Sequence, residues 1–178
     1  MKVSVITVCR NAVESIAQTI RSVQSQDFPD VEHIIVDGAS TDGTMDIINQ
    51  YGFEAGCRII SEPDQGIYDA MNKGIGLASG DVIGFLNADD VYAHEGVLTR
   101  VATIMSERDL DLCFADLRFM QGERVVRHYS SSRFRPERLR FGWMPAHPTT
   151  YVRKEFFERI GGFSLNYKIA ADYEWMVR

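Results

Sequence analysis

Four short apolar runs, each followed by a segment with helical periodicity, constrain the fold of this chain more than any other feature. The runs lie at residues 3–8, 31–36, 57–61 and 81–88. The first, VSVITV, is mostly β-branched, which is typical of a strand buried on both faces. Strands that alternate with helices pair into a mostly parallel sheet through right-handed crossovers. We therefore expect an α/β fold in which helices flank a mostly parallel central sheet.

The segments between these runs carry helix signals. Asn11 is placed to cap a helix that continues to about residue 26. Its apolar positions recur with helical spacing at Val13, Ile16, Ile20 and Val23. Further helices are predicted near 43–51, over 67–79 and near 95–107.

The second half departs from the alternation. LDLCFADLRFM (110–120) and ERVVRHY (123–129), joined at Gln121-Gly122, predict an antiparallel hairpin. A short strand (148–152) and a short helix (154–160) follow a stretch with little periodicity. AADYEWMVR begins a helix without a terminator, so we expect the natural protein to continue. The length suits one domain.

Charge and cysteine content narrow the function classes. The formal charge of −6 argues against a nucleic-acid binder, which usually shows a basic face. The last third of the chain contains one basic run. It is either a solvated face or a site that binds an anionic ligand or a membrane surface. Its members are Arg124, Arg127, Arg133, Arg135, Arg138 and Arg140.

Cys9, Cys57 and Cys113 are far apart and form no CxxC pair, so neither a zinc site nor a disulfide framework is indicated. Buried free thiols imply a reducing compartment. The first apolar run is too short and starts too soon for a signal peptide, and no stretch approaches the ~20 apolar residues of a membrane span. We expect a soluble, cytoplasmic protein.

Acidic residues follow two of the predicted strands. Asp37 ends the second, and Asp89 with Asp90 ends the fourth. Ligands of parallel sheets bind beyond the carboxyl ends of the strands, so the two acidic sites should converge on one crevice. VCRNAVES after the first strand lacks G-x-G-x-x-G, and the chain lacks GxxxxGK[ST]. A dinucleotide site and a P-loop are therefore not expected.

The adjacent carboxylates of Asp89 and Asp90 need an explanation. Two such charges repel by roughly 3–4 kcal/mol at ~4–6 Å and an effective dielectric constant of about 20. A bound divalent cation would relieve this, because Mg²⁺ or Mn²⁺ takes one or two carboxylates together with water and phosphate oxygens. The simpler alternative is that both aspartates cap the next helix.

Over nearly its whole length the chain resembles the family 2 glycosyltransferases. The resemblance rests on VSVITVCRNA, HIIVDGASTDGT, GIYDAMNKGIGLASGDVIGFLNADD, AHPTTYVRKEFFERIGGF and AADYEW, in this order. It implies a metal-dependent inverting enzyme with the GT-A (Rossmann-like) fold that moves a sugar from a nucleotide-diphospho-sugar to a glycan or lipid-linked acceptor. A nucleotide-binding half (about 1–92) and an acceptor half (about 93–178) would share the domain. Bacterial cell-surface polysaccharide assembly is the expected setting.

The resemblance also implies roles for single residues. Asp37 would read the base, Asp89 would face the ribose or the metal, and Asp90 would bind the metal. Asp172 matches the general base. The remaining donor-site positions are Thr7, Asn11, Asp64, Gly66 and Lys73. Asn87 stands where many relatives carry a further aspartate.

Other residues keep more than one interpretation. His147, in PAHPTT, is a metal ligand, an acceptor contact or a loop anchor. Trp143 is a platform for a sugar or a packing residue. Glu174 is near Asp172, but positions of one helix point in different directions, and we expect Asp172 to face the site. Tyr68 and Tyr92 are expected in the core or at its rim.

Two alternative functions remain open. A nucleotidyltransferase-like sugar-nucleotide enzyme would carry a glycine-rich, basic loop after the first strand, which VCRNAVES lacks. A non-catalytic sugar-nucleotide binder would bind the donor without turnover, and the presence of Asp172 disfavours it. The oligomeric state is open, a dimer included.

Overall fold

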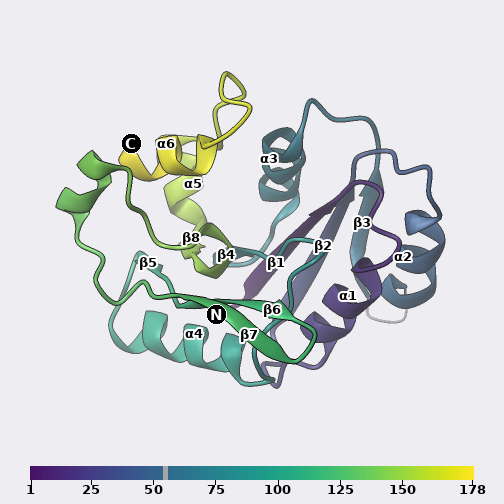
Figure 1. Cartoon of the computed structure of the whole chain (residues 1–178), viewed down its shortest axis with the longest axis horizontal. Helices are drawn as coiled ribbons and strands as arrows, with labels where there is room; N and C mark the ends of the chain where they lie inside the picture. Colours follow the sequence, from purple (N-terminus) through teal and green to yellow (C-terminus); the bar gives the residue numbers. More distant parts are fainter. Residues whose placement is uncertain (54–55) are drawn as a thin grey trace.

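The chain folds around one six-stranded sheet with the strand order β3-β2-β1-β4-β8-β5 (Figure 1). The computed structural model describes residues 1–53 and 56–178. Four strands run parallel to one another, and β8 lies antiparallel between β4 and β5. The strands are β1 (Val3–Cys9), β2 (Val31–Asp37), β3 (Arg58–Ser61), β4 (Val82–Phe85), β5 (Leu112–Cys113) and β8 (Tyr151–Arg153). The predicted mostly parallel α/β fold class is confirmed.

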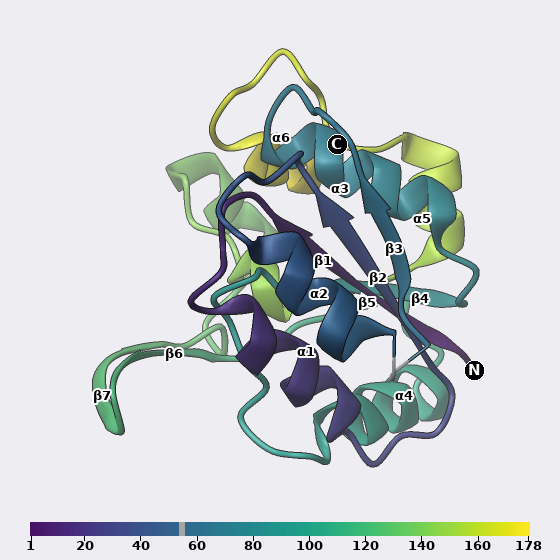
Figure 2. The same ribbon diagram turned by 90° about the vertical axis from the view of Figure 1, so that its right-hand side faces the viewer.

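Helices cover both faces of this sheet (Figures 1 and 2). On one face α1 (Ile16–Gln24), α2 (Thr44–Gly52) and α4 (Val97–Glu107) pack on side chains such as Val5 and Ile35. On the other face α3 (Ile67–Leu77), α5 (Lys154–Ile160) and α6 (Ala171–Val177) pack on Ile6 and Ile34. All seven residues of β1 are buried, which explains why its sequence is almost continuously apolar.

The remaining elements belong to the second half of the chain. β6 (Leu117–Gln121) and β7 (Arg124–Tyr129) form a separate antiparallel hairpin. Two 3₁₀ turns follow, η1 (Pro136–Phe141) and η2 (His147–Thr149). Among the described residues, no helix is both long and apolar enough to cross a bilayer.

Two local predictions are wrong. The first helix begins at Ile16 rather than just after Asn11, because Asn11 is left-handed (φ 52°) and its side chain accepts from the backbone N–H of Thr41. Residues 110–120 do not form one strand. The chain leaves the central sheet after β5 and begins the hairpin at Leu117, because β5 pairs with β8 and β6 pairs with β7.

A half-buried carboxylate joins three segments at the amino edge of the sheet. Glu32 of β2 accepts from the Ser4 hydroxyl of β1 (2.6 Å) and from the backbone N–H of Ser79 (2.8 Å). Burial raises the pKa of Glu32, but these hydrogen bonds and Lys2 outweigh it and lower the pKa to about 2. Glu32 is therefore ionised and ties the segment before β4 to β1 and β2.

Helix α3 lies unusually close to the sheet, and this contact places its first turn at the carboxyl edge. A Cβ on Gly74 would lie 2.4 Å from Cγ2 of Ile6, whereas a Cβ on Gly76, two residues further along, would meet nothing within 4 Å.

We predict opposite effects for the same substitution at these two glycines. Gly74→Ala should lower the free energy of unfolding by about 1–3 kcal/mol through overpacking. Gly76→Ala should raise it by about 0.5–1 kcal/mol, because alanine loses less conformational entropy in a helix. Urea unfolding of both variants measures the difference. Equal effects would contradict the close approach of α3 to β1.

Candidate functional site

Polar side chains gather at the carboxyl edge of the parallel strands. Cys9 ends β1, Asp37 ends β2, and the turn that holds Asp89 and Asp90 follows β4. β1 lies between β2 and β4, and paired strands are about 4.8 Å apart. β2 and β4 are therefore about 10 Å apart across β1, but β4 ends at Phe85, opposite Ile6, three residues before the Cys9–Asp37 pair. Asp37 ends its strand as predicted, whereas Asp89 follows the end of β4 by four residues. That the two acidic sites share one crevice stays a prediction.

Asp37 is completely buried and fully hydrogen-bonded. Oδ1 accepts from the Ser40 hydroxyl and the Cys9 thiol (3.6 Å), and Oδ2 accepts from the Ser40 backbone N–H (3.0 Å) and the Ser61 hydroxyl (2.6 Å). Burial raises the pKa of Asp37, but these donors outweigh it, so the pKa lies below its ordinary value. Asp37 is an ionised carboxylate in a fixed orientation.

This arrangement bears on the expected contact between Asp37 and a base. A carboxylate has about four acceptor sites, and four donors already reach Asp37. A ring N–H would bind only after one of them turns away. The Ser61 hydroxyl is the most accessible of the four donors, since Ser61 is exposed. Base reading by Asp37 stays a prediction.

The loops after β1 and β2 are joined by hydrogen bonds around Asn11. Its Oδ1 accepts from the backbone N–H of Thr41 (2.9 Å), and its own N–H donates to the Ser40 hydroxyl (2.7 Å). The next N–H, of Ala12, donates to the Thr44 hydroxyl (2.7 Å). Asn11 is exposed beside Asp37 and is free to contact a ligand there.

Thr7 lies deeper than a ligand contact would require. It is completely buried within β1, and its hydroxyl lies 2.9 Å from Nε2 of the buried His33. Burial lowers the pKa of His33 to about 4, so the imidazole is neutral. This placement favours a packing role for Thr7, and its expected nucleotide contact stays a prediction.

The segment between β3 and α3 closes the site beyond Asp37. Asp64 accepts from the backbone N–H of Gly66 (2.9 Å). It also lies against Gly38, where a Cβ would come within 2.3 Å of Asp64 Oδ2. Lys73 bonds to Glu62 (2.8 Å) and to the Pro63 carbonyl (2.9 Å). Lys73 thus holds this segment on α3, while Asp64 and Gly66 lie nearer the edge.

The turn after β4 presents Asp89 and Asp90. The backbone N–H of Asp90 donates to the Asn87 carbonyl (3.0 Å), and the buried hydroxyl of Thr19 on α1 donates to the Asp90 carbonyl (2.9 Å). Asp89 is exposed and Asp90 is half-buried. The helix-cap alternative is wrong, because α4 begins seven residues after Asp90 with Gly96 at its N-cap.

The oxygens of this turn fit a divalent cation. Burial, followed by the charge of Asp89, raises the pKa of Asp90. The side-chain oxygen of Asn87 is buried without a hydrogen-bond partner. In the described residues neither aspartate has an ion pair. Two carboxylates and an amide oxygen are hard ligands that suit Mg²⁺ or Mn²⁺ with further positions left for water and phosphate.

Asp172 lies on α6 and contacts the start of α3, and its expected role as general base stays a prediction. Its Oδ1 accepts from the Tyr68 hydroxyl at the start of α3 (2.9 Å). Burial and Asp172 raise the pKa of Tyr68, so the phenol stays protonated and donates. Glu174 instead pairs with Arg178 (2.9 Å), so the two acids of α6 point to different partners.

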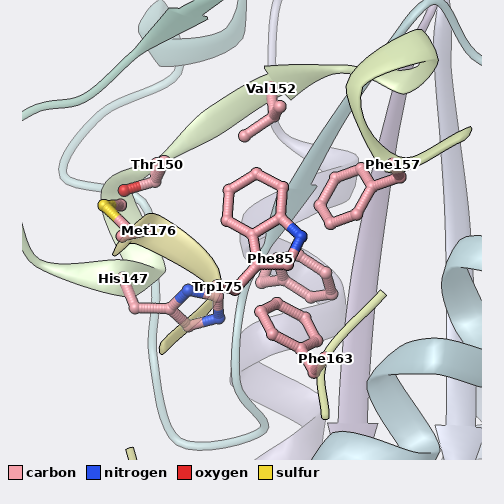
Figure 3. A pocket seen from close by; sticks show the side chains of 8 residues that line it. All are labelled: Phe85, His147, Thr150, Val152, Phe157, Phe163, Trp175 and Met176. Carbon is pink, nitrogen blue, oxygen red and sulfur yellow. The ribbon is translucent and has the colours of Figure 1, made fainter. Parts of the chain in front are cut away.

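His147 lies among aromatic rings (Figure 3). Its ring centroid is 5.1 Å from Phe85 and 5.5 Å from Phe163, beside a cavity of about 10 Å³. Burial lowers the pKa of His147, although the charge of Asp172 opposes this. Its Nε2 is buried without a partner.

His147 does not complete a metal site with the two aspartates. In residues 1–53 and 56–178, no three His, Cys, Asp or Glu side chains come together as metal ligands. The ring is instead placed to connect Phe85, two residues before Asn87, to the region of Asp172.

Trp143 stacks on Phe134 (5.7 Å) and Tyr129 (6.1 Å), which fits the packing interpretation.

Three supporting residues were missed in the sequence. Tyr68 was expected only in the core or at the rim, yet it holds Asp172. Ser61 binds Asp37 and Thr19 fixes the Asp90 turn. A serine or threonine in a strand or helix carries no local signal for such long-range bonds.

Comparisons with known proteins show the family and the fold of this chain. Residues 4–169 match the sequence model of the family described as Glycosyl transferase family 2. A PGL/p-HBAD biosynthesis glycosyltransferase of Mycobacterium bovis is 34% identical over 178 residues, covering 98% of this chain and 68% of that protein. An uncharacterized glycosyltransferase of Mycobacterium tuberculosis is 30% identical, covering 99% and 68%.

Solved structures share the fold. TarS of S. aureus in complex with UDP-GlcNAc superposes with a TM-score of 0.84 at 24% identity, covering 99% of this chain and 52% of that chain. The mannosyltransferase PcManGT of Pyrobaculum calidifontis in complex with GDP-Man and Mn²⁺ gives 0.76 at 19% identity, covering 98% and 50%. The chain therefore spans about half the length of these structures. The predicted GT-A fold is confirmed.

We predict that Ser61→Ala destabilises the protein in a pH-dependent way. At pH 7 the loss of a bond to the charged Asp37 should lower the free energy of unfolding by about 1–3 kcal/mol. The pKa of Asp37 is depressed on folding, so this stabilisation is present above about pH 3.8 and is lost as the pH falls through the folded-state pKa. Chemical denaturation at several pH values measures it.

Ser25→Ala is the matched control, because the Ser25 hydroxyl donates to the neutral Ser22 carbonyl. Its effect should not change with pH. A Ser61→Ala effect that stays constant down to low pH would contradict the assigned hydrogen bond to an ionised Asp37.

Proposed function

Because this chain belongs to glycosyl transferase family 2, we propose that it transfers a sugar from a nucleotide-diphospho-sugar to an acceptor hydroxyl with inversion at the anomeric carbon. One observation carries the proposal. The buried ring of His147 packs on Phe85 of β4, the strand that leads into the turn with Asp89 and Asp90, and lies close enough to Asp172 for that carboxylate to act on its pKa. The predicted family 2 identity is confirmed, and the reaction itself is our proposal.

The donor side of the proposed site is the edge formed by β1, β2 and β4. Asn11, Asp64 and Gly66 lie beside the fixed carboxylate of Asp37. We assign the nucleotide to this side. The complexes of TarS with UDP-GlcNAc and of PcManGT with GDP-Man support a nucleotide-sugar donor.

Asp89, Asp90 and the amide oxygen of Asn87 would hold a Mg²⁺ or Mn²⁺ ion between the protein and the diphosphate. Such an ion supplies charge neutralisation on the leaving diphosphate. The Thr19 hydroxyl keeps the turn in place for it. The Mn²⁺ of the PcManGT complex supports a cation in this fold.

Asp172 is assigned as the general base. The acceptor oxygen forms a bond to the anomeric carbon from the face opposite the leaving diphosphate, the carbon–oxygen bond to the diphosphate breaks, and the hydroxyl proton passes to Asp172. Oδ1 already accepts from Tyr68, so Oδ2 takes the proton. General base catalysis contributes typically 10²–10⁴-fold.

The acceptor side is the loop that leads into α6. Leu165, Tyr167 and Ile169 are 47%, 49% and 84% exposed and directly precede Asp172. Exposed apolar side chains beside a base suit an acceptor with an apolar part. We propose a glycan or lipid-linked acceptor, as in cell-surface polysaccharide assembly. The free thiols of Cys9, Cys57 and Cys113 support a cytoplasmic setting.

The other functions are less well supported. The loop after β1 carries no glycine, and the family match favours a transferase over a nucleotidyltransferase-like enzyme. A non-catalytic sugar-nucleotide binder would not need the Tyr68–Asp172 pair.

We predict metal-dependent nucleotide binding that requires Asp90. Titration calorimetry with UDP and with GDP, each with and without Mn²⁺, should show that one nucleotide binds and that Mn²⁺ strengthens its binding. Asp90→Asn should weaken binding in Mn²⁺ at least about tenfold, or ~1.4 kcal/mol, because a carboxylate ligand is lost.

Asp30→Asn is the matched control, since Asp30 is exposed in the loop before β2, at the opposite edge of the sheet. It should bind as the unchanged protein does. An affinity for nucleotide that changes neither with Mn²⁺ nor with Asp90→Asn would contradict the assigned donor site. So would the absence of binding of both nucleotides.

A further inference from the structure

The β6–β7 hairpin has no role in the proposed reaction, and its apolar side chains are exposed. It forms its own two-stranded sheet and projects away from the rest of the chain (Figure 2). Phe119, Met120, Val125 and Val126 are 43–52% exposed. A two-stranded hairpin is marginally stable alone in water, and exposed apolar groups of this kind mark contact surfaces.

The base of the hairpin is firmly held. Asp116 accepts from the backbone N–H of Ser131 (2.7 Å) and lies 3.1 Å from His128. Tyr129 stacks on Trp143 at an interplanar angle of 15°, and its hydroxyl donates to the Met144 carbonyl (2.6 Å). The fold therefore holds the apolar tip in an exposed position.

The same segment is strongly basic. Residues 117–143 contain seven arginines, two glutamates and no lysine or aspartate, a formal charge of +5, whereas the rest of the chain carries −11. Arg118, Arg124 and Arg127 lie on the hairpin and are exposed. The guanidinium of Arg127 lies 5.2 Å from the centre of the Phe119 ring, so a basic and an apolar side chain are in contact on the hairpin.

Phe141, at the end of η1, is a further exposed apolar side chain in this basic segment. It is 85% exposed and follows Arg138 and Arg140. The guanidinium of Arg138 lies 5.7 Å from the centre of the Trp143 ring, which stacks on Tyr129 of the hairpin. The hairpin and η1 are thus connected through Trp143.

We propose that the β6–β7 hairpin docks the protein on an anionic lipid bilayer. Apolar side chains would enter the interfacial region, and the arginines would bind headgroup phosphates. Membrane binding of this kind scales with buried apolar area and with attraction to anionic lipids, and each basic side chain near the surface adds to it.

Charge complementarity favours an anionic bilayer as the partner of the hairpin. The remainder of the chain is acidic and would be repelled by an anionic surface, so the basic hairpin sets the orientation of docking. A symmetric contact between two copies through the hairpin would bring like charges together. The proposal does not depend on the transfer reaction, although it would bring the enzyme to a lipid-linked acceptor.

Vesicle flotation with the purified chain tests the proposal. The protein should bind vesicles of phosphatidylcholine mixed with phosphatidylglycerol, bind phosphatidylcholine alone weakly, and lose most binding at high salt. Arg124→Glu combined with Arg127→Glu should lower the partition coefficient at least about tenfold. Met120→Ser combined with Val126→Ser should lower it about threefold or more.

The matched control combines Arg100→Glu with Arg108→Glu and so reverses the same number of charges elsewhere. Both arginines are exposed; Arg100 lies in α4 and Arg108 directly follows it. This control should bind vesicles as the unchanged protein does. Equal losses in the hairpin and α4 variants, or no binding to anionic vesicles, would overturn the proposal. Light scattering that shows a dimer broken by the hairpin variants would assign the surface to a second copy and overturn it as well.

Nucleotide binding of the hairpin variants separates the two proposals. A hairpin variant that binds nucleotide normally is folded, so its loss of vesicle binding reports on docking alone. Vesicle binding that persists in Asp90→Asn, whose nucleotide binding is weakened, would likewise show that docking is independent of the donor site.

Discussion

The parallel pairing of β1 with its two neighbours is the constraint on which the rest of the structure depends. Cys9 lies opposite Asp37, and Ile6 lies opposite Phe85. A shift of one residue in either pairing would move every side chain to the other face, and both faces are buried. The apolar core therefore fixes where β2 and β4 end. The acids that follow these ends lie on the carboxyl side of the sheet for that reason.

Two acids on this edge have opposite environments. Asp37 receives four donors and has a lowered pKa, whereas Asp90 has a raised pKa and lies next to a second carboxylate and an unpartnered amide oxygen. Asp37 needs no further hydrogen bond from a ligand and keeps a fixed orientation. Asp90 is stabilised only when a cation arrives. This contrast explains why we assign the cation to the turn after β4.

Much of this could be predicted from the sequence, because local patterns carry it. β-branched runs gave the parallel strands, and an acid directly after a strand lies at its carboxyl end. The start of α1 could not be predicted, because the loop bonds of Asn11 replace its capping role. The split of residues 110–120 depends on which strand each half pairs with, and pairing is a long-range property. The same holds for Tyr68, which meets Asp172 across 104 residues.

Our account assigns donor binding and proton removal to different residues: the donor binds at the ends of β1, β2 and β4, and Asp172 removes the proton. Asp172→Asn tests it most directly, with donor binding measured by calorimetry and turnover measured with a panel of acceptors. Our account predicts binding unchanged within about twofold and turnover reduced by at least about 10²-fold, since only the base is lost. Turnover that persists in this variant, or binding that falls together with turnover, would contradict the account.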